Sequence, residues 1–313
     1  MEANRNTLIS WFILISLALV WGSSFILIKK SLIYFSATEV GVLRVVLSFL
    51  FLLPIAVYHL RSISRKHFLY LTISGFVGSL IPALLFAKAQ TVIDSGLAGT
   101  LNSLTPLFTL LIGLSFFKFQ TRWYNVMGVF IAMFGAIALI YVNSDTGFIF
   151  NFKYALLIIF ATLCYAFNVN FIKVFLKELT SLIITAFSFF YIGIPLVIYV
   201  IFFSDIPHKL TTDTETHTGL GYLLILSIAG TGLALIFFNK LIKISSPVFA
   251  SSVTYLIPIV ALIWGVIDGE AFHLLYFLCF LLILSGIFLI NVTPYKMINF
   301  SSWLFFRNRR KEN

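Results

Sequence analysis

The sequence predicts an all-α integral membrane protein with ten transmembrane helices, arranged as two inverted repeats of five helices each. Three observations lead to this fold class: the chain carries little charge, its apolar residues gather in ten long runs, and its two halves resemble each other. Of its 313 residues, 60% are hydrophobic and only 10% are charged. A soluble domain carries roughly 25% charged residues. A chain with so little charge cannot cover a water-facing surface, so its apolar surface must face lipid.

Ten apolar runs have the length that a membrane crossing requires, which is about 20 residues for a helix. They cover residues 8–28, 37–58, 68–87, 95–117, 124–142, 154–172, 182–203, 219–238, 247–267 and 272–291. A polar break near residue 143 separates the first five runs from the last five. We therefore expect one five-helix repeat over residues 8–142, a second over residues 153–294, and a basic cytoplasmic tail over residues 295–313.

The distribution of charge orients the predicted bundle. With the N-terminus in the cytoplasm, 15 Lys and Arg residues fall in inner loops and 5 in outer loops, and Arg44 lies inside the second run. This asymmetry is the positive-inside bias of membrane proteins. A net charge of +10 would suggest a nucleic-acid partner in a soluble protein, but here the basic residues lie in short gaps between apolar runs. We expect a multi-pass protein of the cytoplasmic membrane with both termini in the cytoplasm and no nucleic-acid partner.

The two halves show an internal repeat. Residues 86–113 align with the segment 152 positions later, including the pair Pro106 and Pro258, and Pro54 and Pro195 form a second pair 141 positions apart. Proline is placed sparingly inside helices, because it removes a backbone hydrogen bond. Since each half has five predicted spans, the second half must enter the membrane from the opposite side. Inverted repeats of this kind are the usual architecture of secondary transporters, with the substrate site near the midplane.

Several short motifs occur at fixed places along the ten runs. In chain order they are Trp21-Gly22-Ser23-Ser24-Phe25, Lys29, Arg44, Pro106, Gly128, Gly135, Gly269-Glu270 and Gly286. In this order and spacing they resemble the EamA family of the drug/metabolite transporter superfamily, over nearly the whole chain. The resemblance implies a ten-helix basket of two five-helix repeats, and export of amino acids or other small metabolites.

The chain departs from the family pattern in each half. The family often has Gly-Glu after the fourth helix, where this chain has Lys118 and Phe119. In the second half, Cys279 replaces the glycine that matches Gly128. A role of the first-half glutamate therefore cannot be carried over to this chain.

Arg44 is the one basic residue well inside a predicted span, about 10 Å into the second run if that helix starts near residue 37. A charge near the centre of a membrane helix costs about 2.5–3.5 kcal/mol on insertion scales, so it needs a partner or a wet cavity. Arg44 could face a cavity and bind an anionic group such as a carboxylate. Alternatively it pairs with Glu39 or with backbone carbonyls, although residues five apart do not share a helical face.

Polar side chains also gather in the equivalent fourth and ninth runs and in the sixth run. Small hydroxyl residues can equally serve close helix packing, and a Trp can equally lie in the headgroup belt. The candidate substrate-binding residues are Trp21, Ser24, Arg44, Asn102, Ser103, Tyr165, Asn168, Ser251 and Tyr255. Among them, Ser251 and Tyr255 are one helical turn apart and would share a face.

No metal or cofactor is expected, because Cys164 and Cys279 both lie in apolar runs and match no metal or redox spacing. No carboxylate falls at the centre of a predicted span. Carriers driven by protons or sodium commonly use a buried acid, so its absence favours facilitated export or exchange.

The sequence therefore predicts a secondary transporter, an exporter of small polar metabolites such as amino acids that works by alternating access. Its expected partners are the substrate and the lipid bilayer, and a homodimer is a further candidate assembly. The alternatives are a membrane-embedded enzyme and a channel. The sequence contains no His-Glu-x-x-His or Gly-x-Ser-x-Gly motif, and nothing in it resembles a selectivity filter.

Overall fold

The computed structural model of the chain is built from helices alone in the part that it describes, which comprises residues 2–60, 63–93, 95–119, 121–143, 152–267 and 274–291. No strand occurs among these residues. The predicted basic tail 295–313 and the Gly269-Glu270 motif lie outside the described residues.

The helices of each half follow the predicted runs. In the first half they are α1 (Glu2–Ser31), α2 (Ala37–Tyr58), α3 (Arg65–Gly75), the π-helical segment η2 (Phe76–Leu80), α4 (Ile81–Ala89), α5 (Ser95–Asn102), α6 (Thr105–Ser115) and α7 (Trp123–Asn143). In the second half they are α8 (Phe152–Phe175), α9 (Ser181–Phe203), α10 (Ile206–Thr212), α11 (Thr216–Ser227), the π-helical segment η3 (Ile228–Leu233), α12 (Ala234–Ile244), α13 (Pro247–Ser251), α14 (Val253–Ile267) and α15 (Leu274–Asn291). Each run therefore forms one helix or a stack of two or three consecutive segments.

Six of these helical stretches are long and apolar enough to cross a membrane. They are Thr7–Ser31, Ala37–Tyr58, Arg65–Ala89, Phe152–Phe175, Ser181–Phe203 and Thr216–Ile244. Four shorter apolar helices occupy the remaining predicted runs: Thr105–Ser115, Trp123–Ala138, Pro247–Val260 and Leu281–Ile290. The all-helical membrane fold is thus confirmed, and the exact number of spans stays a prediction.

The start of α2 shows how local sequence sets a helix boundary. Ser36 caps the helix by accepting a hydrogen bond from the Glu39 backbone N–H, and the Glu39 carboxylate accepts one from the Ser36 N–H at 2.7 Å. This reciprocal capping box satisfies two donors that a helix start otherwise leaves unpaired. The Glu39 carboxylate also binds the Lys209 ammonium of α10 at 2.8 Å. Glu39 is thereby committed to α10 and does not pair with Arg44.

The π-helical segments η2 and η3 occupy equivalent places in the two halves. Residue 76, where η2 starts, and residue 228, where η3 starts, are 152 positions apart, which is the shift of the internal repeat. A π-helical turn inside an α-helix loosens the regular hydrogen-bond ladder, and such turns occur frequently at functional sites. The internal repeat thus includes an irregular backbone feature as well as paired side chains.

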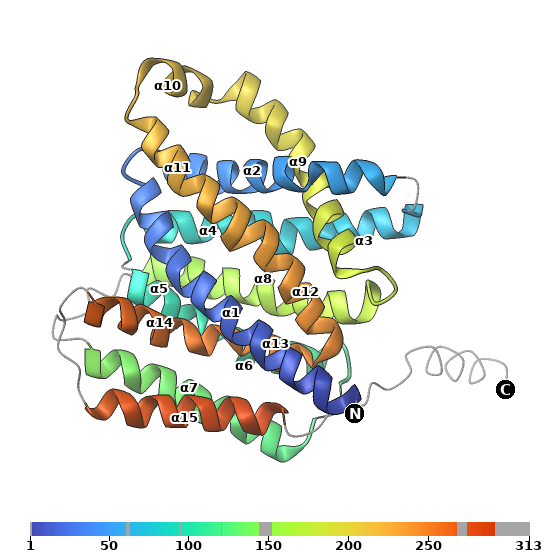
Figure 1. Cartoon of the computed structure of the whole chain (residues 1–313), viewed down its shortest axis with the longest axis vertical. Coiled ribbons are helices and arrows are strands. Elements are labelled where there is room, and N and C mark those ends of the chain that lie inside the picture. Colours follow the sequence, from blue (N-terminus) through green and yellow to red (C-terminus); the bar gives the residue numbers. More distant parts are fainter. Residues whose placement is uncertain are drawn as a thin grey trace.

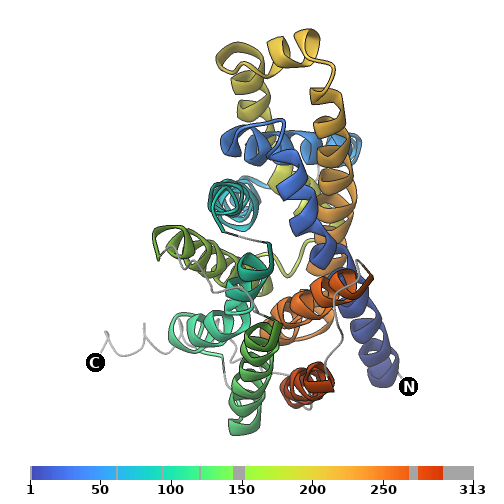
Figure 2. The same ribbon diagram turned by 90° about the vertical axis from the view of Figure 1, so that its left-hand side faces the viewer.

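The helices of the two halves pack on one another in similar ways, and their arrangement can be followed in Figure 1. Helix α1 packs against α14 and against α11 and α12 of the second half, while α8 packs against α5, α6 and α4 of the first half. Helices α2 and α9, which correspond to each other in the two halves, pack on each other. The last helices of the two halves, α7 and α15, also pack on each other. The α7–α15 pair and the short helix α10 lie at opposite ends of the molecule in both views (Figure 2).

Glycine allows the closest of these contacts, between α7 and α15. A Cβ atom added at Gly286 would lie 2.5 Å from the backbone nitrogen of Ala132, and one added at Gly128 would lie 2.7 Å from the Gly286 carbonyl oxygen. Asn125 fixes the register of the pair, because its side-chain amide donates to the Leu289 and Ile290 carbonyls at 3.1 and 3.0 Å. Small residues at such a contact let two helix backbones approach in lipid.

We predict that Gly286→Ala lowers the thermal unfolding midpoint of the detergent-solubilised protein, because the obstructing atoms belong to a backbone that cannot move aside. Overpacking of this kind typically costs about 1–3 kcal/mol. The matched control is Gly221→Ala, since a Cβ at Gly221 meets nothing within 4 Å. Equal midpoints for the two variants would contradict the proposed backbone contact.

Lys118, which stands where the family pattern has glycine, adopts a left-handed backbone conformation with φ of 52°. This conformation costs a residue with a side chain roughly 1–2 kcal/mol, whereas glycine adopts it freely. Lys118 thus replaces the glycine of the family pattern but adopts a backbone conformation that favours glycine.

We predict that Lys118→Gly is more stable than Lys118→Ala, by up to about 1 kcal/mol. Both variants lose the lysine side chain, so their difference in thermal midpoint measures the backbone term alone. An alanine variant as stable as the glycine variant would show that the turn relaxes to an ordinary conformation.

Candidate functional site

A cavity of about 110 Å³ lies between the two halves, lined by helices of both. A water molecule needs roughly 10–15 Å³ measured in this way, so the cavity holds several waters or one small molecule. Its walls come from α1, α2, the η2 region, α5 and the start of α6 in the first half, and from α8, α9, the η3–α12 region, α13 and α14 in the second.

The lining of the cavity repeats in pairs across the two halves. Trp21 and Tyr165 are 144 positions apart, as are Ser24 and Asn168, and all four line the cavity. Because α1 and α8 are the first helices of their halves, these pairs occupy equivalent places. Equivalent positions of the two halves therefore meet in one cavity.

Aromatic contacts join each half to the other around the cavity. The Trp21 ring meets Phe238 edge-on, with ring centroids 5.0 Å apart. Tyr165 stacks on Phe86 with centroids 6.1 Å apart, and Phe86 and Phe238 are themselves 152 positions apart. The Trp21 indole N–H donates to the Gly230 carbonyl at 2.9 Å. The Trp21 side chain is thus part of the cavity wall, and its polar atom is already bonded to η3.

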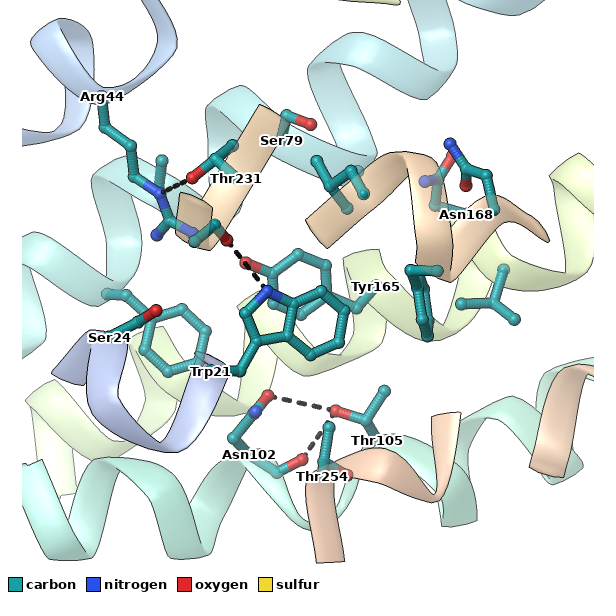
Figure 3. A pocket seen from close by; sticks show the side chains of 18 of the residues that line it. Trp21, Ser24, Arg44, Ser79, Asn102, Thr105, Tyr165, Asn168, Thr231 and Thr254 are labelled. Atoms are coloured by element: carbon teal, nitrogen blue, oxygen red, sulfur yellow. Dashed lines mark hydrogen bonds between the residues drawn. The ribbon is translucent and has the colours of Figure 1, made fainter. Parts of the chain in front are cut away.

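Arg44 extends from α2 into the cavity (Figure 3). Its Nε–H donates to the Thr231 hydroxyl at 2.8 Å, and that hydroxyl donates to the Leu226 carbonyl at 3.0 Å. Tyr165 of α8 lines the same cavity. Among the described residues that line the cavity, Arg44 is the only charged one. A guanidinium has five N–H donors, so most of its donors remain for a bound group.

Asn102 lines the cavity at a break between α5 and α6. Pro106 deprives the Asn102 carbonyl of its helical partner, and the Thr105 hydroxyl takes that place by donating to it at 2.7 Å. Thr105 also lines the cavity. Helix breaks in lipid are tolerated where neighbouring side chains satisfy the freed backbone groups, which is what Thr105 does here.

Ser103 lies next to Asn102 but outside the cavity lining. Its hydroxyl is buried and donates to the Thr254 carbonyl at 3.0 Å. That carbonyl is the group that Pro258 leaves without its helical partner. Ser103 therefore satisfies the backbone of the opposite half.

Ser251 lines the cavity, whereas Tyr255 is fully buried and points to α7, where its hydroxyl donates to the Val129 carbonyl at 3.1 Å. The expectation of a shared face assumed a continuous helix. The chain instead makes a turn at Ser252 between α13 and α14, so side chains on either side of that turn diverge. The structure thus brings seven of the candidate residues to the cavity: Trp21, Ser24, Arg44, Asn102, Tyr165, Asn168 and Ser251.

Several further polar residues line the cavity that the sequence patterns did not single out. They are Ser74, Ser79, Thr185, Ser188, Thr231 and Asn239. One signal could have found two of them: the shift of 152 also pairs Gly78 with Gly230 and Ser79 with Thr231, just upstream of the aligned segment.

The fold and this cavity define a class of protein: a multi-pass helical membrane protein whose two related halves enclose a small cavity of mixed apolar and polar lining. The model of the EamA-like transporter family matches the chain twice, over residues 8–141 and 152–292. The chain therefore belongs to the EamA-like transporter family, and it is a membrane transporter of the drug/metabolite type. The family is one of transporters, not enzymes.

Solved structures show the same fold. One crystal structure, described only as that of a protein, matches with a TM-score of 0.68 and 15% sequence identity, covering 91% of this chain and 96% of the other. At this identity the likeness concerns the fold alone. No protein with a curated description matches the chain.

We predict that a cysteine at Ser79, which lines the cavity, reacts with methanethiosulfonates, and that an anionic sulfonate reagent reacts faster than a cationic trimethylammonium one. The reason is that Arg44 is the charged group of the lining, and opposite charges attract. The assay uses a Cys164→Ser, Cys279→Ser background.

Ser103→Cys is the control, because Ser103 lies outside the lining. Adding Arg44→Gln should abolish the preference for the anionic reagent. Equal labelling of the two introduced cysteines would show that Ser79 does not face an accessible cavity.

Proposed function

We propose that this protein is a secondary transporter that exports small polar metabolites, amino acids among them, by alternating access. One observation carries the proposal: a guanidinium in the central cavity, with no carboxylate among the described residues that line it. A buried charge is stable only when it is paired or solvated. A substrate carboxylate supplies the missing counter-charge, and it can accept two parallel N–H bonds from arginine.

The arrangement around Arg44 also couples the bound group to the moving parts. Arg44 belongs to α2 of the first half, and its present partner Thr231 belongs to η3 of the second half. A carboxylate bound to the guanidinium competes with the Thr231 hydroxyl for the N–H donors of Arg44. Substrate binding would thereby weaken a hydrogen bond that joins the two halves. Alternating access requires such a contact to differ between states, since a ligand shifts a conformational equilibrium only by its differential affinity.

The orientation of the chain and of its two repeats in the membrane is proposed from the distribution of charged residues among the loops. The excess of Lys and Arg in loops on one side, 15 against 5, supports a cytoplasmic location of both termini in the cytoplasmic membrane. With five spans in each half, this orientation requires inverted repeats.

The cavity chemistry favours transport over a membrane-embedded enzyme. No His, Cys, Asp or Glu is found among the described residues that line it, and these residue types supply most general bases and nucleophiles. The same lack of a lining carboxylate favours facilitated export or exchange over proton coupling. A channel would need a continuous path along which ions bind only weakly. The site here is a small cavity that contains the charged guanidinium of Arg44.

We predict that Arg44→Ala lowers efflux of amino acids from loaded proteoliposomes by about 10- to 100-fold, because hydrogen bonds to a charged group contribute about 1.5–3 kcal/mol. Arg44→Lys should give an intermediate rate, since lysine keeps the charge but not the planar fork. The readout is the initial rate of labelled substrate exchange at equal amounts of reconstituted protein.

The matched control is Lys240→Ala, which removes one positive charge from an exposed position on α12. It should transport as the unmodified protein does. Normal efflux by Arg44→Ala would remove the guanidinium from the substrate site and defeat the proposal.

A further inference from the structure

One pair of equivalent positions in the cavity lining differs in charge. Arg44 stands ten residues before Pro54 on α2, and Thr185 stands ten residues before Pro195 on α9. The same shift of 141 relates Phe49 to Phe190, and these two rings contact each other with centroids 6.1 Å apart. Thr185 therefore occupies in the second half the place that Arg44 occupies in the first.

The surroundings of Thr185 are polar but uncharged. Asn239 of α12 donates its side-chain amide to the Thr185 hydroxyl at 2.9 Å. Ser188 lies one turn further along α9, and Asn168 lies on α8; all four side chains line the cavity. Figure 3 shows Arg44 and Asn168 on opposite sides of the cavity, with Trp21 and Tyr165 between them.

Two polar atoms at this second end are buried and have no hydrogen-bond partner among the described residues: the side-chain oxygen of Asn168 and the hydroxyl of Ser188. The residues Asn168 and Ser188 lie against neighbouring turns of the helical stretch formed by α3 and η2. Gly78 of η2 packs directly on the Asn168 amide, and Gly75 of α3 packs on the Ser188 backbone. A buried polar group without a partner destabilises a fold, so a bound group that reaches these two atoms and supplies the missing partner is stabilised there.

We propose that the cavity has two unlike ends, a carboxylate end at Arg44 and an uncharged hydrogen-bonding end at Asn168 and Ser188. The inference rests on the transport function proposed above and narrows its substrate class. The substrate is a carboxylate whose far end carries an amide, a hydroxyl or a heterocyclic N–H. Its middle part is apolar, because the rings of Trp21 and Tyr165 lie between the two ends (Figure 3), packed against Phe238 and Phe86.

A charged far end is disfavoured by the same geometry. The described lining has no acidic side chain to pair with a side-chain ammonium, and no basic side chain other than Arg44 to pair with a second carboxylate. The α-ammonium of an amino acid differs, because its own α-carboxylate lies beside it as a counter-charge. An amide or hydroxyl both donates and accepts hydrogen bonds, as do Asn168 and Ser188. An uncharged amide or hydroxyl of the substrate can therefore form hydrogen bonds with Asn168 and Ser188.

The test compares amino acids that share the same carboxylate and ammonium and differ only at the far end. Two pairs of similar shape serve as probes in proteoliposome exchange: glutamine against methionine, and tyrosine against phenylalanine. One hydrogen bond changes affinity by about 3- to 10-fold, so at least one pair should favour its polar member by that factor. Glutamate and lysine should both exchange more slowly than glutamine.

Two variants probe the far end. Ser188→Ala should bring the preference for the polar member to about one. Asn168→Asp places a carboxylate there, and should shift selectivity from glutamine towards lysine. The control is Ser285→Ala on α15, an exposed hydroxyl bonded only to its own helix, which should keep the original preference.

Failure of this inference differs from failure of the transport proposal. Suppose that the unmodified protein exchanges the probes and that Arg44→Ala abolishes this exchange. If neither pair then shows a preference for its polar member, or if both far-end variants keep that preference, the proposed uncharged end is wrong, while the carboxylate end at Arg44 is still supported. If Arg44→Ala exchanges all probes normally, the proposed function itself fails.

Discussion

The structure depends on one constraint: a backbone carbonyl inside a membrane finds no water, so every break in a helix must bring its own hydrogen-bond donor. Three breaks near the cavity show how this chain meets it. The Thr105 hydroxyl binds the Asn102 carbonyl, the Ser103 hydroxyl binds the Thr254 carbonyl, and the Thr231 hydroxyl binds the Leu226 carbonyl. Side chains that satisfy the backbone and side chains that face the cavity are therefore neighbours, and in the case of Thr231 they are the same residue.

The approximate twofold symmetry explains both the position of the cavity and its chemical polarity. Interdigitated pairs such as Trp21 with Phe238 and Tyr165 with Phe86 place the cavity where the halves meet. A perfectly symmetric site would present two identical ends to an unsymmetric metabolite. Arginine in one half and threonine in the equivalent position of the other make the two ends unlike, and a substrate of the proposed kind would therefore bind in a single orientation.

Sequence patterns predicted the helices well, because apolar runs of membrane length have few alternatives in lipid. They also predicted Arg44, since a charge deep in a helix stands out on an apolar background. They failed where a conclusion required a continuous helix: Tyr255 was grouped with Ser251, and the turn at Ser252 separates them. Ser79 and Thr231 were missed because the aligned segment began only at residue 86, although the same shift of 152 pairs these two hydroxyl residues as well.

The two π-helical segments also restrict where the chain can change in length. One residue added or removed there would rotate everything downstream by about 100°, turning Phe238 and Asn239 away from the cavity. The offset between the halves stays at 152 from η2 and η3 through the paired prolines of α6 and α14, and it grows from 141 only across the loop that holds α10. That loop has already absorbed extra sequence without disturbing the register of the bundle. It is therefore the natural place for an inserted tag or antibody epitope.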